Sequence, residues 1–388
     1  MLFEYLLSDC QPHALPPIKF ICFSDTKFIL FLCKCQIFGV FMVRVLVVDD
    51  SLISRKYLTR ILEESGQIEV IDTASDGLEA IEKVKTLKPD VVTMDIEMPK
   101  LNGIEALKRI MLENPTPIIM VSTLTTEGAS ITLEALHLGA VDYIPKNDVL
   151  NFNKITKDAR ELLIAKTIAA KNSKIQKPKL IKPPPSIEQI KTAAPQKITT
   201  KDIRLIAIAT STGGPVALEK IMSEFPKVNV PVLIVQHMPA TFTPIFAKSL
   251  DRISSIPIKE AQDQEIVQNG KGYLAPGGLQ MSIVDKNGLL AIKISDQPKT
   301  IYVPSADVLF SSCAETTKNR TLAIIMTGMG NDGYEGLLKL KKAGGTIIAQ
   351  SKESCVVWGM PRKPTENNIV DYIGDLEEIP NIVKKIIG

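Results

Sequence analysis

Apolar runs alternate with helix-like segments through the first half of the chain. The run VRVLVV is apolar apart from Arg44, which is typical of a parallel strand buried on both faces. Residues 51–64 then place apolar side chains at helical spacing, and Gly66 suits the end of that helix. The alternation continues through the strands IEVID, VVTM, PIIMVS and VDYI, with helices over 77–87, from Gly103, and ending near Leu138. This pattern predicts an α/β domain whose parallel sheet of five strands is covered on both faces.

A second series of strands and helices begins near residue 203. The segments RLIAIA, PVLIVQ, TLAIIMT and GTIIAQ are apolar runs of strand length. Residues 215–225 form a helical pattern with Pro215 in its first turn. Residues 256–294 hold shorter, more polar strand patterns with Gly-rich turns, which favour hairpins. We therefore expect a second, doubly wound α/β domain with hairpin insertions.

Lysine and proline dominate the region between the two series. Residues 161–201 include KPKLIKPPPS and AAPQK and hold no aromatic residue. Consecutive prolines forbid a helix and favour extended polyproline geometry, so we predict a linker here. The linker divides the chain into a first domain at 42–160 and a second domain at 202–388. Two domains also fit the length of 388 residues, which exceeds what a single core needs.

Residues 1–41 lack clear periodicity and hold four of the six cysteines. Met42 directly precedes the first strand, so we expect this extension to reflect a mis-assigned start rather than a targeting segment. Only Cys313 and Cys355 remain beyond it, too few for a disulfide framework, which favours a reducing cytoplasm. The net charge of +3 gives no reason to expect binding to nucleic acid. No apolar run is long enough for membrane insertion.

Charged and polar residues gather at the ends of the strands predicted in the first domain. Asp49 and Asp50 end the first strand, Asp95 the third and Ser122 the fourth, while Lys146 follows the fifth. In an open parallel sheet these positions meet in one crevice at the carboxyl edge. Three close carboxylates repel one another unless a cation lies among them, and oxygen ligands favour Mg²⁺. A helix N-cap would explain one or two of these residues but not the whole set.

The second domain places Ser211 between a strand and a Gly-Gly-Pro turn into a helix. The N–H groups at a helix start favour negative charge, so a serine nucleophile there would have donors for its oxyanion. A nucleotide-binding loop is a weaker interpretation, because neither GxGxxG nor Gly-Lys-Ser/Thr is present. An ordinary N-cap serine is the structural alternative.

A serine nucleophile needs a base, and the chain has three histidines. His13 lies in the extension and His137 on the last predicted helix of the first domain, which leaves His237 directly after a buried strand. Asp332 follows another such strand, in GMGNDG, and could orient the imidazole. Strand ends would then bring Ser211, His237 and Asp332 into one crevice. A lone histidine at a strand end is more often structural, so only geometry decides between the two interpretations.

Four motifs of the first domain, VVDDS, MDIEMPKLNG, VST and DYIPK, lie between residues 42 and 150. Together they resemble a response-regulator receiver. The resemblance implies a flavodoxin-like fold and a phosphoacceptor, Asp95, that takes phosphate from a histidine kinase. It also implies that Mg²⁺ is held by Asp49, Asp50, Asp95 and Glu97, and that the phosphoryl group is bound by Ser122 and Lys146.

Six motifs of the second domain, ATSTGGP, QHMP, YLAPGG, PSADVLF, TGMGNDG and SCVVWGMP, follow one another up to the C-terminus. In this order they resemble the chemotaxis methylesterase family (CheB). The resemblance implies a nucleophile at Ser211, a base at His237 and an orienting acid at Asp332. It further implies that the Met329 N–H is an oxyanion donor and that the Thr212 hydroxyl helps to position His237. The family usually has Gly-Ala before the serine, where this chain has Ala-Thr.

The two resemblances together imply an adaptation enzyme of chemotaxis. Its activity would be the phosphorylation-activated demethylation of glutamate methyl esters, and the deamidation of glutamines, on methyl-accepting chemoreceptors. The implied partners are a chemotaxis histidine kinase and those receptors, and the esterase reaction would need no cofactor.

Two other functions compete with this interpretation. A receiver-controlled transcriptional regulator predicts a short helical output domain with a basic recognition helix, whereas the output region here is long and rich in strands. A non-catalytic signalling module is disfavoured because Ser211, His237 and Asp332 are all present at the matching positions.

Overall fold

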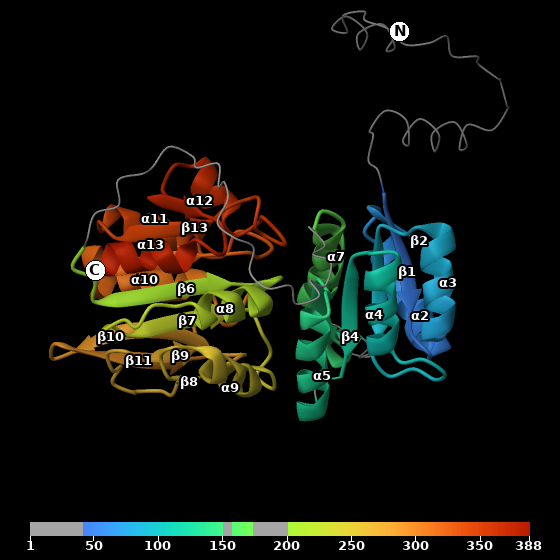
Figure 1. Ribbon diagram of the computed structural model, residues 1–388, viewed down its shortest axis with the longest axis horizontal. Helices are drawn as coiled ribbons and strands as arrows, with labels where there is room; N and C mark the ends of the chain where they lie inside the picture. Colours follow the sequence, from blue (N-terminus) through green and yellow to red (C-terminus); the bar gives the residue numbers. More distant parts are fainter. Residues whose placement is uncertain (1–41, 124, 150–156, 174–200) are drawn as a thin grey trace, which may run out of the picture. The chain divides into compact units, whose positions relative to one another are not determined.

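The first of two parallel sheets lies in the N-terminal half of the described chain (Figure 1). The computed structural model describes residues 42–123, 125–149, 157–173 and 201–388; the predicted extension at 1–41 and most of the predicted linker lie outside them. The first sheet has the order β2-β1-β3-β4-β5, and all its neighbouring strands are parallel. Its strands are β1 (Val43–Val48), β2 (Ile68–Ala74), β3 (Val91–Asp95), β4 (Ile118–Ser122) and β5 (Asp142–Pro145).

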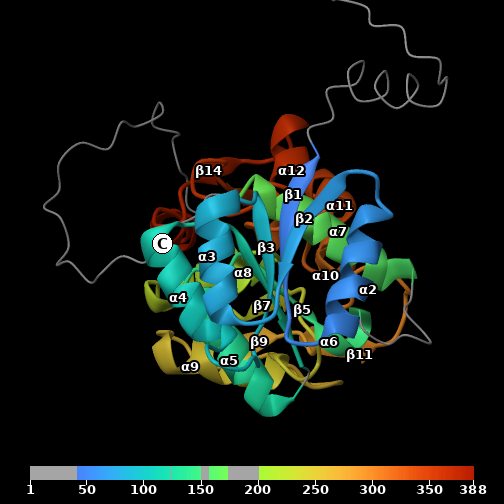
Figure 2. The same cartoon turned by 90° about the vertical axis from the view of Figure 1, so that its right-hand side faces the viewer.

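Helices cover both faces of this sheet (Figure 2). One face carries α2 (Leu52–Glu63) and α7 (Lys157–Lys171), and the other carries α3 (Gly77–Leu87), α4 (Gly103–Glu113) and α5 (Thr126–His137). Successive residues of β1 pack alternately on the two faces. Val45 and Val47 pack on the first face, and Leu46 and Val48 pack on the second. This double burial explains why VRVLVV is apolar except at the exposed Arg44. The strand order confirms the predicted five-stranded α/β fold.

The last helix of this domain extends past the boundary expected at residue 160. α7 continues to Lys171, and Leu163, Thr167 and Ala170 on it are fully buried. The first 11 residues of the predicted linker, 161–171, are therefore part of a packed helix rather than a spacer. The helix is possible because no proline interrupts this stretch, whereas Pro178 and the prolines after it lie farther along. A one-turn helix, α6 (Lys146–Val149), follows β5 directly.

The second sheet has the order β14-β13-β12-β6-β7-β9-β8, again with parallel neighbours throughout. In the region expected to form hairpins, two short strands join this parallel sheet instead, and the rest forms one antiparallel hairpin, β10–β11. The strands are β6 (Leu205–Thr210), β7 (Val232–Gln236), β8 (Ile258–Glu260), β9 (Gly272–Leu274), β10 (Gln280–Lys286), β11 (Leu289–Ser295), β12 (Thr321–Ile325), β13 (Thr346–Gln350) and β14 (Tyr372–Gly374).

The second sheet is also covered on both faces. Alternate residues of β6 again divide between the two cores, with Ile206 and Ile208 on one side and Leu205 and Ala207 on the other. The first side carries α8 (Gly214–Ser223), α9 (Thr243–Ile253) and α13 (Ile379–Ile387), and the second carries α10 (Ala306–Thr316), α11 (Tyr334–Lys342) and the β10–β11 hairpin. Two short helical segments, η1 (Lys318–Arg320) and α12 (Arg362–Glu366), complete the domain.

The strand orders fix where ligands can bind. In the first sheet the order reverses between β1 and β3, and in the second it reverses between β6 and β12. Crevices form at the carboxyl ends of strands beside such reversals. Among the described helices, none combines the length and the apolar character needed to cross a membrane.

Gly103 at the start of α4 provides a test of this packing. A Cβ atom here would overlap the carbonyl oxygen of Asp95, and the Gly103 N–H donates to the Ile96 carbonyl at 2.9 Å. We expect Gly103→Ala to destabilise β3 and α4 by about 1–3 kcal/mol, because backbone must shift to admit the methyl group. Leu112→Ala is the control on the same helix, since Leu112 is 66% exposed. Hydrogen exchange of the β3 and α4 amides measures the effect, and unchanged protection in Gly103→Ala would contradict the packing.

Candidate active site and metal site

Ser211, His237 and Asp332 form one hydrogen-bonded group in the second domain. Ser211 directly follows β6, His237 directly follows β7, and Asp332 lies in the loop between β12 and α11. Ser211 Oγ lies 3.0 Å from His237 Nδ1, and His237 Nε2 lies 2.7 Å from Asp332 Oδ2. The three side chains are buried, with 9% of the imidazole exposed. The strand ends that the sequence pointed to thus bring a hydroxyl, an imidazole and a carboxylate into contact.

The chemistry of the partners fixes where the protons lie. An ionised carboxylate can only accept hydrogen bonds, so the Asp332 contact places the proton of a neutral imidazole on Nε2. Nδ1 then carries a lone pair and accepts from the Ser211 hydroxyl. His237 is therefore oriented to take a proton from Ser211, as the base of a nucleophilic pair must be.

Asp332 stays ionised because several donors surround it. Burial alone would raise its pKa, but the pKa of this carboxyl is lowered by the hydrogen bond and charge of His237 and by hydrogen bonds from Ser305 and Ala306. Ser305 Oγ donates to Oδ1 at 2.7 Å, and the Ala306 N–H donates to Oδ2 at 2.6 Å. Ala306 is the first residue of α10, so the carboxylate also lies at a helix N-terminus, where negative charge is favoured.

Gln236 ties the nucleophile and the base together, a role that sequence reasoning missed. Its Nε2 donates to the carbonyls of Ser211 and His237 at 3.0 and 3.1 Å. Its Oε1 accepts from the Thr210 hydroxyl, and all of Thr210 is buried. Thr210 directly precedes Ser211, where the resemblance implied an alanine, and its hydroxyl supplies a partner for a buried glutamine. The only available signal was that Gln236 opens the motif QHMP.

The loop after β12 approaches the serine from the other side. A Cβ atom on Gly328 would lie 2.8 Å from Ser211 Cβ and would collide with Met360, so the approach depends on glycine. Met329 follows, largely buried, and among the hydrogen bonds of the described residues its N–H is not a donor in any. A backbone donor without a protein acceptor beside a nucleophile has the character of an oxyanion donor.

Thr212 is placed differently from what the resemblance implied. Both ring nitrogens of His237 already contact Ser211 and Asp332, so the Thr212 hydroxyl does not bond to the imidazole. Within the unit formed by residues 42–388, it donates instead to Asp142 Oδ2 at 2.5 Å. The Thr212 carbonyl accepts from the Thr327 hydroxyl at 3.0 Å, which joins the turn after β6 to the loop after β12.

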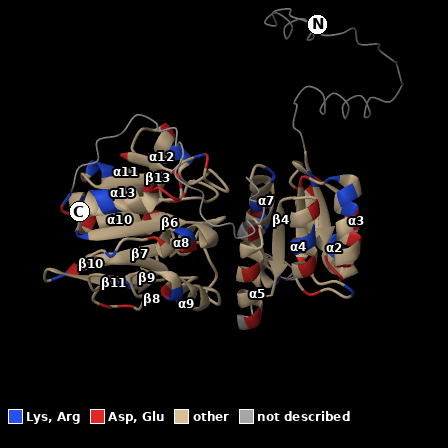
Figure 3. Cartoon of the chain, viewed as in Figure 1, with Lys and Arg blue, Asp and Glu red and all other residues tan. Residues whose placement is uncertain are grey.

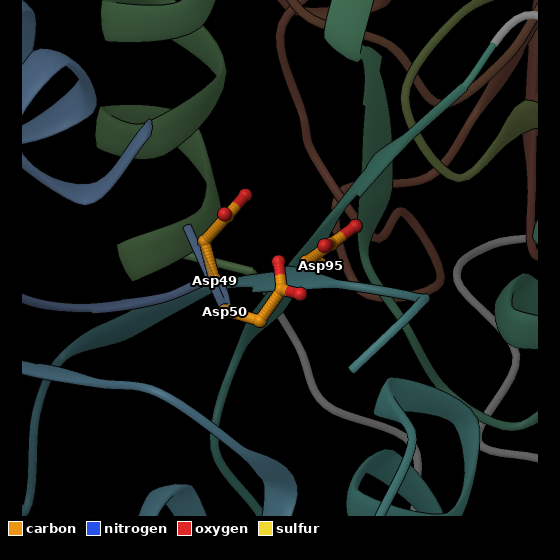
Figure 4. Close-up of side chains that lie close together, drawn as sticks. All are labelled: Asp49, Asp50 and Asp95. Carbon is orange, nitrogen blue, oxygen red and sulfur yellow. The ribbon is translucent and has the colours of Figure 1, made fainter. Parts of the chain in front are cut away.

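Three carboxylates gather at the carboxyl edge of the first sheet (Figure 4). Ligand atoms of Asp49, Asp50 and Asp95 all lie within 4.8 Å of one another. Lys146 Nζ lies 2.6 Å from Asp95 Oδ2 and 3.1 Å from Asp49 Oδ2. The residues expected at the ends of β1 and β3 and after β5 therefore do converge, as the strand order requires.

This group fits a hard divalent cation. Asp49 is completely buried, and its Oδ2 has no hydrogen bond among the described residues despite the nearby Lys146. Burial, with the charge of Asp49 adding to it and Lys146 opposing it, raises the pKa of Asp95 to about 6. Oxygen ligands that are short of positive charge suit Mg²⁺. The Glu97 side chain is exposed and outside the three-carboxylate group, and a cleft lined by Asp50 and Glu97 opens beside it.

Ser122 ends β4, as expected, and is 2% exposed. Its Oγ lies 2.7 Å from Thr132 Oγ1 of α5, and Thr132 Oγ1 lies 2.6 Å from the Gly128 carbonyl oxygen. Thr132 is thus a further polar residue of this site that the motifs did not single out.

Comparison with known proteins shows to which family the chain is similar. The CheB methylesterase family model matches residues 206–383, and the response regulator receiver domain model matches residues 45–157. The protein-glutamate methylesterase/protein-glutamine glutaminase of Lawsonia intracellularis is 44% identical to this chain, over 87% of the chain and 97% of the relative. The chain belongs to the CheB methylesterase family.

A second relative and one solved structure are also similar to this chain. The protein of the same description from Pyrococcus horikoshii is 40% identical over 89% of this chain and 94% of its own length. Among solved structures, the catalytic domain of the Thermotoga maritima CheB methylesterase is 37% identical, covering 47% of this chain and 99% of that chain with a TM-score of 0.46.

Family membership makes the chain a hydrolase with an attached receiver domain. The alternative of a transcriptional regulator is not favoured, because the methylesterase match occupies the output region. In the view of Figure 3, lysines and arginines lie interspersed with acidic residues along the helices rather than on a single basic face. Cys313 is also a poor nucleophile, since complete burial raises the pKa of its thiol to about 12.

Asp307, whose N–H donates to Asp332, allows a test of how burial shifts carboxyl pKa values near the site. Its Oδ1 accepts from the Gly336 N–H at 2.7 Å, and burial raises its pKa to about 6, with Asp332 and Glu335 adding to the shift. Because the folded state then binds this proton more tightly than the unfolded state, stability falls as pH rises from about 4 to about 6. Asp307→Asn cannot ionise, so its free energy of unfolding should not fall in this pH range. The difference from the natural chain should be on the order of 1–2 kcal/mol, because Asp307 is only partly buried.

Urea unfolding at pH 4 to 7 measures the difference between Asp307→Asn and the natural chain. The advantage of the variant should grow with pH and level off above about 6. Glu315→Gln removes an exposed carboxylate from the same helix and should show no such trend. A constant difference across the range would contradict the burial of an ionisable Asp307.

Proposed function

We propose that the chain is a serine hydrolase that demethylates glutamate methyl esters and deamidates glutamines on chemoreceptor proteins in the cytoplasm. The contact of Ser211 with His237, and of His237 with Asp332, is the observation that carries this proposal. The substrate class is supported by relatives described as protein-glutamate methylesterases/protein-glutamine glutaminases, which match over nearly their full length.

The first half of the reaction uses the three residues in sequence. Ser211 Oγ attacks the carbonyl carbon of the glutamyl ester while His237 Nδ1 takes its proton. Asp332 stabilises the imidazolium that forms, and the Met329 N–H donates to the oxyanion of the tetrahedral intermediate. The intermediate expels methoxide, which takes the proton from His237 and leaves as methanol. An acyl bond to Ser211 remains.

The second half restores the enzyme. A water molecule gives a proton to His237 and attacks the acyl carbonyl, and the same proton then returns to Ser211 as the glutamate carboxylate leaves. A glutamine side chain follows the same path, with ammonia in place of methanol as the first product. The proton transfers thus use groups that already lie in contact, Ser211 with His237 and His237 with Asp332.

Substitution of the three residues tests these roles. Ser211→Ala and His237→Ala should each lower methanol release from methylated receptor membranes by at least about 1,000-fold, because nucleophile and base act as a unit. Asp332→Asn should cost about 10- to 100-fold less than either, since it misorients the base but leaves it present. Ser223→Ala, on the exposed side of α8, is the control and should keep full activity. Substantial release by Ser211→Ala would rule out this nucleophile.

We further propose that Asp95 accepts phosphate from a histidine kinase. The convergence of Asp49, Asp50 and Asp95 supports a Mg²⁺ site there, completed by the Glu97 carbonyl. The ion would supply charge neutralisation between these carboxylates and the incoming phosphoryl group. Lys146 already contacts Asp95 at 2.6 Å and would bind a phosphoryl oxygen together with Ser122.

Control of the esterase follows from the tether between the domains. The linker keeps the receiver domain at a high effective concentration near the hydrolase domain. Even weak docking of the receiver onto the hydrolase can therefore inhibit the esterase reaction. A chain that starts at Lys201, whose N–H bonds to the Ile386 carbonyl, should release methanol several-fold faster than the unphosphorylated full chain. Mg²⁺ with a small phosphodonor should activate the full chain but not Asp95→Asn. Equal rates for the shortened and full chains would exclude inhibition by the receiver.

A further inference from the structure

Tyr302 lies flat against the imidazole of His237. The two ring centroids are 4.3 Å apart, and the ring planes differ by 6°. The edges of the imidazole are taken by Ser211 at Nδ1 and by Asp332 at Nε2. Tyr302 therefore contacts the base through the ring face, which neither of its hydrogen-bonding partners covers.

Gln280, the buried first residue of β10, holds the segment that carries Tyr302 by hydrogen bonds. Gln280 Nε2 lies 2.7 to 3.4 Å from three acceptors of this segment, and Oε1 accepts from the Ser305 N–H at 2.8 Å. The three acceptors are the Pro298 carbonyl, the Thr300 hydroxyl and the Tyr302 carbonyl. Because Ser305 also donates to Asp332, one glutamine fixes both the stacked ring and a donor to the acid.

The Tyr302 ring also reaches the loop beside the nucleophile. A Cβ atom on Gly330 would lie 2.8 Å from Tyr302 Oη, so the phenol packs against the backbone that follows Met329. Burial, and then the charge of Asp332, raises the pKa of the Tyr302 phenol, which keeps the ring neutral. The preceding residue, Ile301, is 81% exposed and shows that the neighbouring chain is at the surface.

A neutral aromatic face suits a base that becomes positively charged. When His237 takes the proton of Ser211 it becomes an imidazolium, and aromatic faces attract cations that lie within about 6 Å of the ring centroid. The flat contact also limits rotation of the imidazole away from its two hydrogen bonds. Both effects favour the protonated state that precedes the departure of methanol.

We propose that Tyr302 is a positioning residue for His237: its ring holds the imidazole in the plane of Ser211 and Asp332 and stabilises it when protonated. The proposal rests on the serine hydrolase function described above. In this proposal the aromatic ring of Tyr302, and not its hydroxyl, supports the activity of His237. A residue that only filled space would be replaceable by an aliphatic side chain of similar bulk.

Kinetics of three substitutions test the assignment. Tyr302→Phe keeps the ring, and its kcat for methanol release should stay within about twofold of the natural chain. Tyr302→Leu and Tyr302→Met remove the ring but keep apolar bulk, and each should lower kcat by about three- to tenfold with little change in KM. Ile301→Ala is the control at the exposed neighbour and should leave kcat unchanged. An equal loss in Tyr302→Phe, or no loss in both aliphatic variants, would overturn the proposal.

A spectroscopic measurement tests the stacking without substrate. The chain has three histidines, so labelling histidine with ¹³C at Cε1 gives three ring signals, and His237→Gln identifies the one of interest. Protons above an aromatic face are shielded, so this signal should stay in place in Tyr302→Phe and move downfield in Tyr302→Leu. The His137 signal, from α5 of the receiver domain, should not move in either. A stationary His237 signal in Tyr302→Leu overturns the stacking, whereas absent methanol release by the natural chain would overturn the hydrolase function instead.

Discussion

A parallel strand covered on both faces carries few polar side chains except at its ends. Five central strands are almost entirely buried along their lengths: β1, β3, β6, β7 and β12. Alternate residues of each strand pack into the cores on its two opposite faces. The polar side chains of both sites therefore lie at the last residue of a strand or in the loop that follows it. Because the strands are parallel, these ends meet along one edge, and the reversal of strand order opens a crevice there. The cluster of three carboxylates and the serine–histidine–aspartate group both follow from this one constraint.

Two aspartates at the carboxyl edges of the two sheets have pKa values that are shifted in opposite directions. Asp332 is surrounded by donors from His237, Ser305 and the start of α10, which lower its pKa against the effect of burial. Asp95 shares its crevice with the buried Asp49, and burial raises its pKa to about 6 although Lys146 is close. The first environment stabilises an imidazolium, and the second is short of positive charge. One carboxylate contacts an imidazole, and the other lies among further carboxylates.

Glycine and glutamine complete the second site in a way that connects its loops. Gly328 lets the loop after β12 lie against Ser211, and a side chain there would push it away. Gln236 holds the carbonyls of Ser211 and His237, while Gln280 holds the segment of Tyr302 and Ser305. Two buried amides thus set the distances among groups that come from four separate parts of the chain. Their energetic importance is that a buried amide with its partners in place is rigid, whereas one that loses a partner is costly.

The sequence by itself determined the elements and the strand-end residues of this protein. Continuous apolar runs separated by helical patterns indicated two parallel sheets, and Asp49, Asp95, Ser211 and His237 followed from their positions after those runs. Local signals of this kind are short-range, because burial of a strand and capping of a helix depend on neighbouring residues. Only the tertiary structure decided that α7 continues through residue 171, that β8 and β9 join the parallel sheet, and that Thr212 faces Asp142 rather than His237. It also decided the roles of Gln236, Gln280 and Tyr302, since their partners lie on other strands or loops and no local pattern encodes a contact between distant segments.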